Sequence, residues 1–342
     1  MRGQQKPMIA TPERPAFRPP APRPRAEAPG LLTFLLALRR NPLTTWTERH
    51  FREKVISGEG ILGRVMVVND PPIIRHVLVD NAANYRKDDL QLRVLAPGLG
   101  RGLLTADGEE WRLQRRTIAP LFTPRTVQGF FPAMRESAER LVRRWQRRPD
   151  GRIVDVSLEM TRVTLDVLER TVFTTGISHN PDALGRAITR YFEGLGRIDP
   201  VDIFGLPAWV PRMIAARKAL LGSGQPAPRD LLTLLLEASD PETGKGLSDL
   251  DVNANIVTFI GAGHETTANA LSWSIYLISQ DEHARARIEA EVDDVLGADA
   301  IEPAHLDRLV YTRAVLEEAM RLYPPVPFLS RAAIANDRAG DF

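Results

Sequence analysis

One helical pattern of some thirty residues constrains this chain more than any other feature. Ser248 and Asp251 have the spacing of a capping box, and the pattern runs to about Gln280, before Asp281 can begin another helix. At about 1.5 Å per residue, such a helix is about 45–50 Å long, which is the diameter of a whole domain. The sequence therefore predicts a large domain built around one central helix.

Most of the remaining sequence is also helical in its period. We expect further helices at about residues 157–168, 181–196, 211–221, 230–236 and 306–323. Short apolar segments rich in β-branched residues predict strands at residues 61–68 and 153–156. The expected fold class is thus mainly α with a small β-sheet region.

The N-terminal part of the chain has a different composition. Residues 1–30 contain eight prolines, six basic and two acidic side chains, which predicts a disordered leader and leaves 31–342 as the domain. Residues 31–38 predict a short amphipathic helix docked on the core, with membrane-interface contact as the alternative. This apolar run is shorter than the roughly 20 residues that a transmembrane helix needs. The whole chain carries a net charge of only +2, so no nucleic-acid-binding surface is expected.

The residue types present exclude several kinds of covalent and metal site. The chain contains no cysteine, which excludes disulfides, thiolate nucleophiles and cysteine-ligated metals within it. The absence of cysteine is compatible with a reducing compartment, and we expect a cytoplasmic location. A zinc-protease motif beginning at His264 would need a second histidine at position 268, which is Ala268.

The centre of the long helix reads Gly261-Ala262-Gly263-His264-Glu265-Thr266-Thr267. Two helical glycines cost roughly 1 kcal/mol each relative to alanine, but they leave backbone that a ligand can approach. Thr266 can donate to the carbonyl of Ala262, and an acid beside a hydroxyl suits a proton relay. The alternative is a tight helix crossing at the glycines, with Glu265 facing solvent.

A second motif places an indole and a guanidinium together. Trp111 and Arg115 are four residues apart, so one helix face offers both groups to an anionic oxygen such as a carboxylate. Arg112 and Arg116 form a separate stripe on the same helix. A basic, solvated helix anchored by one tryptophan is the alternative.

Two further motifs are less specific. Glu318 and Arg321 share a helix face and can form an ion pair, immediately before Tyr323-Pro324-Pro325. The glycines at 98, 100 and 102 lack the spacing of a dinucleotide-binding loop and predict a mobile loop.

The order and separation of these motifs resemble the cytochrome P-450 family of haem-thiolate monooxygenases, from about residue 31 to the end. The resemblance implies heme b as the cofactor. It implies that Trp111 and Arg115 hold one haem propionate, that Arg331 binds a propionate too, and that Ala262 and Gly263 border the oxygen site. Segments 90–104 and 191–210 would border the pocket, and their apolar residues suggest an apolar substrate.

The resemblance also implies how the other motifs act. Glu265 and Thr266 would deliver protons to dioxygen, one atom of which enters the substrate while the other leaves as water. Glu318 and Arg321 would form a buried pair that braces the haem-binding core. Electrons would come from NAD(P)H through a ferredoxin or a reductase. If Arg115 faces the haem, Arg112 and Arg116 face outward and would help to dock an acidic electron carrier.

The family's iron-binding cysteine loop has no counterpart in these 342 residues. The expected fold is therefore a cytochrome P-450 fold that is incomplete at its C-terminus, and we expect this chain to be inactive alone. The alternative function is a cofactor-free pseudoenzyme or binding module on the same scaffold.

Overall fold

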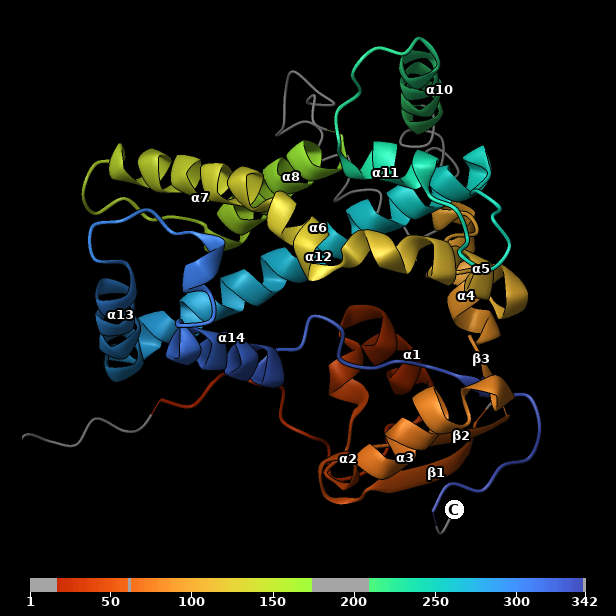
Figure 1. Ribbon diagram of the computed structural model, residues 1–342. Helices are drawn as coiled ribbons and strands as arrows, with labels where there is room; N and C mark the ends of the chain where they lie inside the picture. The colour runs from red at the N-terminus through yellow and green to blue at the C-terminus, as the bar shows by residue number, and fades with distance from the viewer. Residues whose placement is uncertain (1–16, 61–62, 174–208, 341–342) are drawn as a thin grey trace, which may run out of the picture.

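The structure, a computed structural model, describes residues 17–60, 63–173 and 209–340, and the long helix dominates it. Helix α12 spans Asp249–Gln280 and crosses the whole molecule (Figure 1). Ser248 and Asp251 form the predicted capping box at its start. Asp281 caps the next helix, α13 (Glu282–Leu296), by accepting a hydrogen bond from the amide of Ala284.

The main core lies along α12. Helix α8 (Val156–Val172) packs most extensively against it, and α14 (Val310–Leu322), α10 (Trp209–Gly222) and α11 (Leu231–Glu237) add further contacts. The most deeply buried apolar side chains on these elements and their neighbours are Ile118, Val172, Phe173, Val210, Leu232, Leu235, Val252 and Ile256. Asp230 caps α11 as predicted, accepting from the amide of Thr233.

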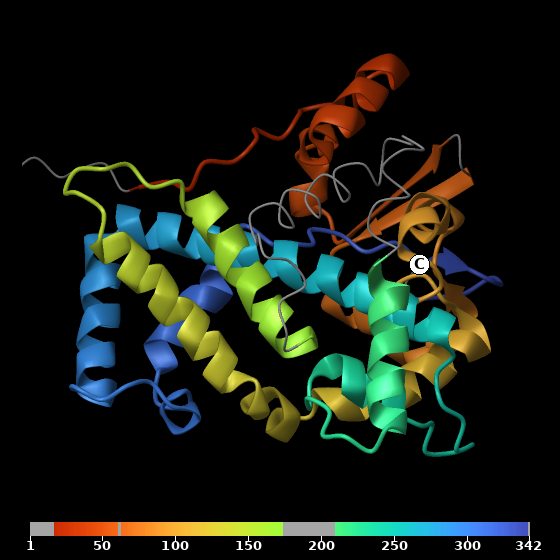
Figure 2. The same cartoon turned by 90° about the horizontal axis from the view of Figure 1, so that it is seen from above.

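The other helical segments lie around this core or, as α1, α2 and α3 do, in the lower part of the molecule as drawn in Figure 1 (see also Figure 2). Helix α7 is joined to α8 by a buried carboxylate, Glu159, which accepts hydrogen bonds from Arg144, Arg148 and Arg162. The remaining segments are α1 (Leu31–Arg40), η1 (Pro42–Thr45), α2 (Arg49–Arg52), α3 (Pro71–Arg75), η2 (His76–Asp80), η3 (Ala82–Asn84), α4 (Asp89–Leu99), α5 (Gly108–Ile118), η4 (Ala119–Phe122), α6 (Pro124–Gly129), α7 (Phe131–Gln146) and η6 (Pro303–His305).

Two small antiparallel sheets complete the described part. Strand β1 (Val55–Gly60) pairs with β2 (Gly63–Val68), which confirms most of the strand predicted at 61–68. Its partner was missed because the sequence of β1, with two glycines, a serine and a glutamate, lacks a β-branched run. Strand β3 (Tyr85–Arg86) pairs with β4 (Ala332–Ala333), so the end of the chain returns to its beginning. The fold class, mainly α with little strand, is confirmed.

Several predicted boundaries were wrong. No strand forms at residues 153–156: Ile153 is 94% exposed and Val156 begins α8, which is capped by Asp155 and not by Ser157. Asp155 is the N-cap because its carboxylate accepts a hydrogen bond from the amide of Leu158. The last helix, α14, begins at Val310 and not near residue 306. The helix predicted at 181–196 and the pocket segment 191–208 lie outside the described residues.

The N-terminal helix formed as predicted, but not its docking. In α1, Leu31, Leu32 and Leu36 are each more than half exposed. The chain before it is described from Phe17 onward, where the amide of Arg25 donates to the carbonyl of Trp46. The division into a leader of residues 1–30 and a domain of 31–342 stays a prediction.

Candidate functional site

The centre of α12 combines a side-chain hydrogen bond to the helix backbone with a glycine that faces α8. The hydroxyl of Thr266 donates to the carbonyl of Ala262, as predicted. Glu265 and Thr266 are half-buried, whereas Ala262 is exposed. A Cβ added to Gly263 would lie 3.4 Å from a methyl carbon of Leu168 on α8. Gly263 therefore faces α8 at a distance where an added methyl group would make ordinary van der Waals contact, while Ala262 is exposed one residue away.

His264 lies in the same turn, and its burial was not predicted from the sequence. Its side chain is 1% exposed, and neither ring nitrogen has a hydrogen-bond partner in the described part of the chain. Burial lowers the pKa of His264 to about 4. The ring is thus neutral at neutral pH, and it places a polar group without a partner inside the core.

Helix α5 presents its indole and guanidinium on one face, as predicted. Trp111 is 37% exposed and Arg115 is also exposed. Arg115 forms no ion pair with any described residue, so its five N–H groups are available to an acceptor. Asp107 caps α5 through the amide of Gly108, which begins the helix and sets the direction of both side chains.

A buried lysine lies beside this face. The Nζ atom of Lys87 is 6.0 Å from the centre of the Trp111 ring and donates to the carbonyls of Leu103 and Ala106. Burial lowers the pKa of Lys87 to about 8; Asp107 opposes this shift and Arg331 adds to it. The positive charge of Arg331 thus acts on Lys87, whose ammonium group lies over the Trp111 ring.

This set of donors fits a ligand that carries carboxylates. The guanidinium group of Arg115 and the indole N–H of Trp111 supply hydrogen-bond donors, while Arg331 and Lys87, whose ammonium group is already bonded to two carbonyls, add positive charge. The propionate edge of a haem matches that chemistry. No group of three or more histidine, aspartate or glutamate side chains among the described residues could hold a metal, and the chain has no cysteine. The residues present therefore fit the carboxylates of a haem and supply no thiolate for its iron.

The loop between α4 and α5 is held in place, contrary to the predicted mobility of its glycines. The amide of Leu103 donates to the side chain of Asn255 at 2.9 Å, and Asn255 in turn donates to Gln114 at 3.0 Å. A Cβ at Gly102 would lie 2.8 Å from the hydroxyl oxygen of Thr258. The glycine is needed because the loop backbone presses against α12, not because the loop moves.

Comparison with known proteins decides the family. The family model described as Cytochrome P-450 matches residues 63–342, most of the chain. The chain belongs to the cytochrome P-450 family. This cytochrome P-450 is similar to the crystal structure of the cytochrome P-450DA heme domain, with a TM-score of 0.78, 28% identity, and coverage of 94% of this chain and 73% of that one.

Two curated relatives are similar over most of this chain. Cyclooctatin synthase of Streptomyces melanosporofaciens is 32% identical over 79% of this chain, which spans 61% of that protein. A bifunctional cytochrome P-450/NADPH–P-450 reductase of Gibberella moniliformis is 32% identical over 69% of this chain and 23% of its own length. The chain thus spans less than two thirds of these relatives. No helix among the described residues is long and apolar enough to cross a membrane.

The ion pair of α14 forms in this cytochrome P-450, but it is not buried. Both contacts between Arg321 and Glu318 are 2.7 Å, and hydrogen bonding to Arg321 lowers the pKa of Glu318. Their side chains are 67% and 55% exposed. The expectation of a buried brace was wrong here because no described residue covers this face of α14.

The expected docking stripe for an electron carrier is already paired within the molecule. Arg116 donates to Asp240 at 2.9 and 3.0 Å and lies 3.1 Å from Glu242, while Arg112 pairs with Glu109. These contacts neutralise the stripe, so the prediction that it recruits an acidic partner is not supported by the geometry. Asp240 is 124 residues from Arg116 in sequence, and no local pattern reveals such a partner.

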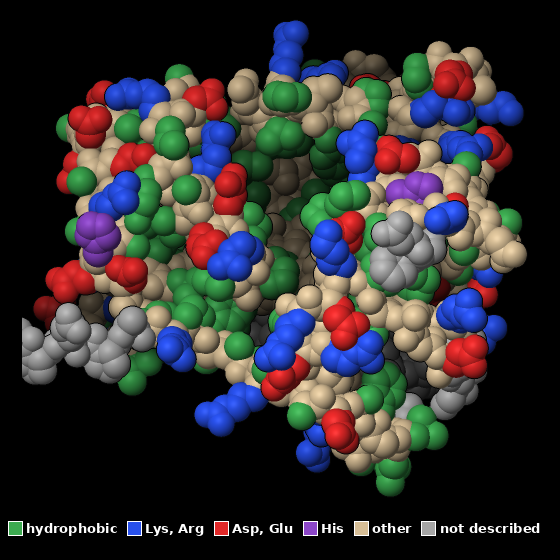
Figure 3. All heavy atoms as spheres, turned by 90° about the horizontal axis from the view of Figure 1, so that it is seen from below, with side chains coloured by type: hydrophobic (Ala, Val, Ile, Leu, Met, Phe, Trp, Pro, Cys, Tyr) green, Lys and Arg blue, Asp and Glu red, His purple; other side chains and the backbone are tan. Residues whose placement is uncertain are grey.

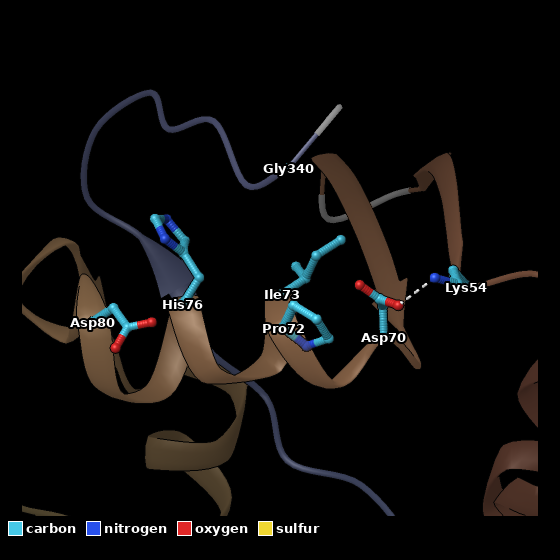
Figure 4. Close-up of a pocket in the computed structure, with 7 residues that line it drawn as sticks. All are labelled: Lys54, Asp70, Pro72, Ile73, His76, Asp80 and Gly340. Atoms are coloured by element: carbon cyan, nitrogen blue, oxygen red, sulfur yellow. Dashed lines mark ion pairs between the residues drawn. The ribbon is translucent and has the colours of Figure 1, made fainter.

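A surface pocket of about 360 Å³ lies away from these groups (Figure 4). It is bounded by α3, η2, the ends of the β1–β2 sheet and the C-terminal segment near Gly340. Its charges are already paired: Lys54 lies 2.9 Å from Asp70, and His76 hydrogen-bonds Asp337. None of the candidate cofactor or relay residues lines it.

Proposed function

We propose that this chain forms the larger part of a haem-dependent monooxygenase that inserts one atom of dioxygen into an apolar organic substrate. The observation that carries the proposal is the exposed pair of Trp111 and Arg115 on α5, with the ammonium group of Lys87 6.0 Å from the centre of the Trp111 ring. The face seen from below is also hollowed and lined by hydrophobic side chains (Figure 3). Apolar walls with cations at one edge suit a flat, apolar ring system bearing carboxylates.

Each of these residues would hold one part of the cofactor. Arg115 and the indole N–H of Trp111 would bind one propionate, and Arg331 would bind a propionate as well, with Lys87 as an additional cation. When bound, the haem supplies the activation of dioxygen and accepts the electrons. Ala262 and Gly263 offer the least bulky stretch of α12, where a small molecule could approach the backbone.

The protons would pass through the adjacent polar pair. The hydroxyl of Thr266 donates to the carbonyl of Ala262, so its oxygen can accept a hydrogen bond from a proton donor, and its own proton would be transferred when the bond to Ala262 is released. Glu265 is half-buried next to it and would exchange protons with solvent. We infer that these two side chains are the relay.

We also propose an electron source and a location. A relative that is named as a fusion with an NADPH–P-450 reductase supports a reductase as the partner and NADPH as the electron source. A ferredoxin is the alternative electron donor. We propose a cytoplasmic location for the protein. The alternative, a cofactor-free binding module, is favoured by one observation, which is the absence of cysteine from the chain.

The cation cluster can be tested by titrating the chain with haemin and with haemin dimethyl ester, following tryptophan quenching. We expect the ester to bind roughly tenfold or more weakly, because its carboxylates are masked. Arg115→Ala should remove most of this preference. Arg112→Ala is the matched control, since Arg112 is on the same helix but pairs with Glu109. Equal affinity for both haemins would refute the assigned site.

The reaction itself is tested by supplying NADPH, a reductase and isotopically labelled dioxygen to the haem-loaded protein with fatty acid, terpenoid and aromatic probes. Incorporation of one labelled oxygen atom into a probe supports the monooxygenase. If a form of the protein that includes a thiolate ligand binds haem tightly but incorporates no labelled oxygen into any probe, the binding module is favoured instead.

A further inference from the structure

Helix α5 is oriented mainly by polar contacts. Of its three buried side chains, Gln114, Thr117 and Ile118, only Ile118 is apolar. Apolar burial has no preferred direction, so one isoleucine fixes the rotation of a helix about its axis only weakly. The direction in which α5 presents Trp111 and Arg115 therefore depends on hydrogen bonds, which are directional.

The segment between α11 and α12 passes beside α5 and folds into a closed turn there (Figure 1). The amide of Asp240 donates to the carbonyl of Lys245, and its own carbonyl accepts from the amide of Gly244, both at 2.8 Å. Gly244 has a φ of +70°, which favours glycine. Ser239 and Gly246 pair as an antiparallel bridge at the base of the turn. The backbone of Asp240 is thus held on both sides.

The carboxylate of Asp240 is a preformed acceptor for Arg116. Its side chain is fully buried, and the hydroxyl of Thr243 donates to it at 2.7 Å. The guanidinium of Arg116 binds both carboxylate oxygens, with Nε at 2.9 Å and Nη2 at 3.0 Å, and its Nη1 lies 3.1 Å from Glu242. Hydrogen bonding to Arg116 holds the pKa of Asp240 well below its usual range. Two parallel N–H···O bonds to a rigid acceptor fix the plane of the guanidinium as well as its position.

Both sequence neighbours of Arg115 are anchored, to different parts of the molecule. Successive helical residues are about 100° apart around the axis, so Arg115 points between Gln114 and Arg116. The amide of Gln114 donates to the carbonyl of Arg101 at 2.8 Å and accepts from Asn255 at 3.0 Å. A rotation of α5 that moved Arg115 would stretch the contacts of one neighbour or the other.

We propose that the pair of Arg116 and Asp240 positions Arg115 for the carboxylate of the cofactor. The pair also decides which of two adjacent arginines is left for a ligand, because Asp240 takes up the donors of Arg116. Neither residue touches the cofactor, so both are positioning residues that act through Arg115. This inference rests on the proposed haem site.

The test compares the affinities of the chain for haemin and haemin dimethyl ester, followed by tryptophan quenching. Asp240→Asn and Arg116→Ala should each weaken haemin binding roughly threefold to tenfold. Binding of the ester should not change, because its carboxylates are masked. Arg116→Lys, a milder change, keeps the charge but loses the fork of donors, and should behave as Arg116→Ala does.

The matched control is Asp230→Asn. Asp230 is also a fully buried carboxylate bound by both ends of an arginine, Arg217, at 2.5 and 2.9 Å, but this pair joins α10 to α11. Its loss should lower the urea midpoint as Asp240→Asn does, and should leave the ratio of the two haemin affinities unchanged. A change in this ratio therefore separates positioning from a general loss of stability.

The decisive variant combines the two sites. If Asp240 acts through Arg115, Asp240→Asn should have no further effect on the affinity ratio in a chain that already carries Arg115→Ala. The inference is overturned if Asp240→Asn leaves the ratio unchanged in the otherwise unmodified chain, or lowers it equally with and without Arg115. Equal affinity of the unmodified chain for both haemins would refute the haem site itself, and the inference with it.

Discussion

Single buried polar groups set the most direct constraints on this molecule. His264 lies in the core with no partner for either ring nitrogen among the described residues, directly beside the acid and hydroxyl of the candidate relay. Its neutral ring can be accommodated, but a charged ring there would have no compensating contact. His264 should therefore make the stability of the fold depend on pH.

We predict that His264 makes the fold sensitive to acid. Because the folded protein holds this proton with a pKa of about 4 and the unfolded chain at about 6.5, the neutral ring's contribution is complete above pH 6.5 and is lost as the pH falls toward 4. The loss attributable to this group at pH 5 is about 2 kcal/mol. Urea unfolding at pH 7.5 and pH 5 should show that His264→Leu loses less stability than the unmodified chain. An identical loss in both proteins would contradict the assignment.

A second residue-scale prediction concerns Lys87. Its Nζ atom satisfies the carbonyls of Leu103 and Ala106, so Lys87→Met should leave both without a partner and destabilise the chain by about 1–3 kcal/mol. The same change should weaken haemin binding, because a cation beside Trp111 is lost. Lys54→Met, at an exposed lysine whose partner is Asp70, is the control and should affect neither measurement strongly.

At the scale of elements, a buried amide pair connects three parts of the candidate site. Gln114 comes from α5, Asn255 from α12, and the amide of Leu103 from the loop between α4 and α5. Gln114 is next in sequence to Arg115, and Asn255 lies about three helical turns before Glu265 and Thr266. The pair therefore couples the cofactor-facing helix to the central helix and to the loop between them.

Removing this amide should release the loop. Asn255→Ala deletes the acceptor for Leu103 and leaves Gln114 partly unsatisfied in the core, which should cost about 2–4 kcal/mol. Hydrogen exchange at residues 100–106 should become faster, while exchange in α13 should not change. Ser274→Ala is a control on the same helix, because its hydroxyl bonds only the carbonyl of Ala270 within α12. Unchanged protection of the loop in Asn255→Ala would show that the glycine contacts alone hold it.

At the scale of the whole molecule, one face of α14 is not covered by any described residue. Glu318 and Arg321 are exposed there, as are Val326, Phe328 and Leu329 on the segment that follows α14. That segment leads to β4, which pairs with β3, so the C-terminal part of the chain contacts a strand from its N-terminal part. The ion pair in this setting is a solvated surface pair.

We therefore predict that Glu318→Gln leaves the denaturation midpoint of this chain essentially unchanged, because exposed pairs contribute little. A buried brace, which the family resemblance implied, would instead give a large loss. Glu159→Gln is the comparison: that carboxylate is buried and pairs with three arginines, which lie on α7, on α8 and in the segment between them, and its neutralisation should lower the midpoint clearly. A large loss for Glu318→Gln would show that the face is covered in solution.

The sequence by itself determined the long helix, its capping box at Ser248, the pairing of Thr266 with Ala262 and the shared face of Trp111 and Arg115. All of these depend on residues three or four apart, where helical geometry decides the contact. It also determined the family, because the order of the motifs is itself a sequence property.

Only the tertiary structure placed Lys87 beside Trp111, paired Arg116 with Asp240, pressed Gly102 against Thr258 and left Leu32 of α1 exposed. Leu103 and Asn255 are 152 residues apart, and nothing in the local pattern of either selects the other. Such contacts are decided by how helices pack and which surfaces remain for loops and side chains. That packing depends on the whole chain at once, whereas periodicity and capping act within a few residues.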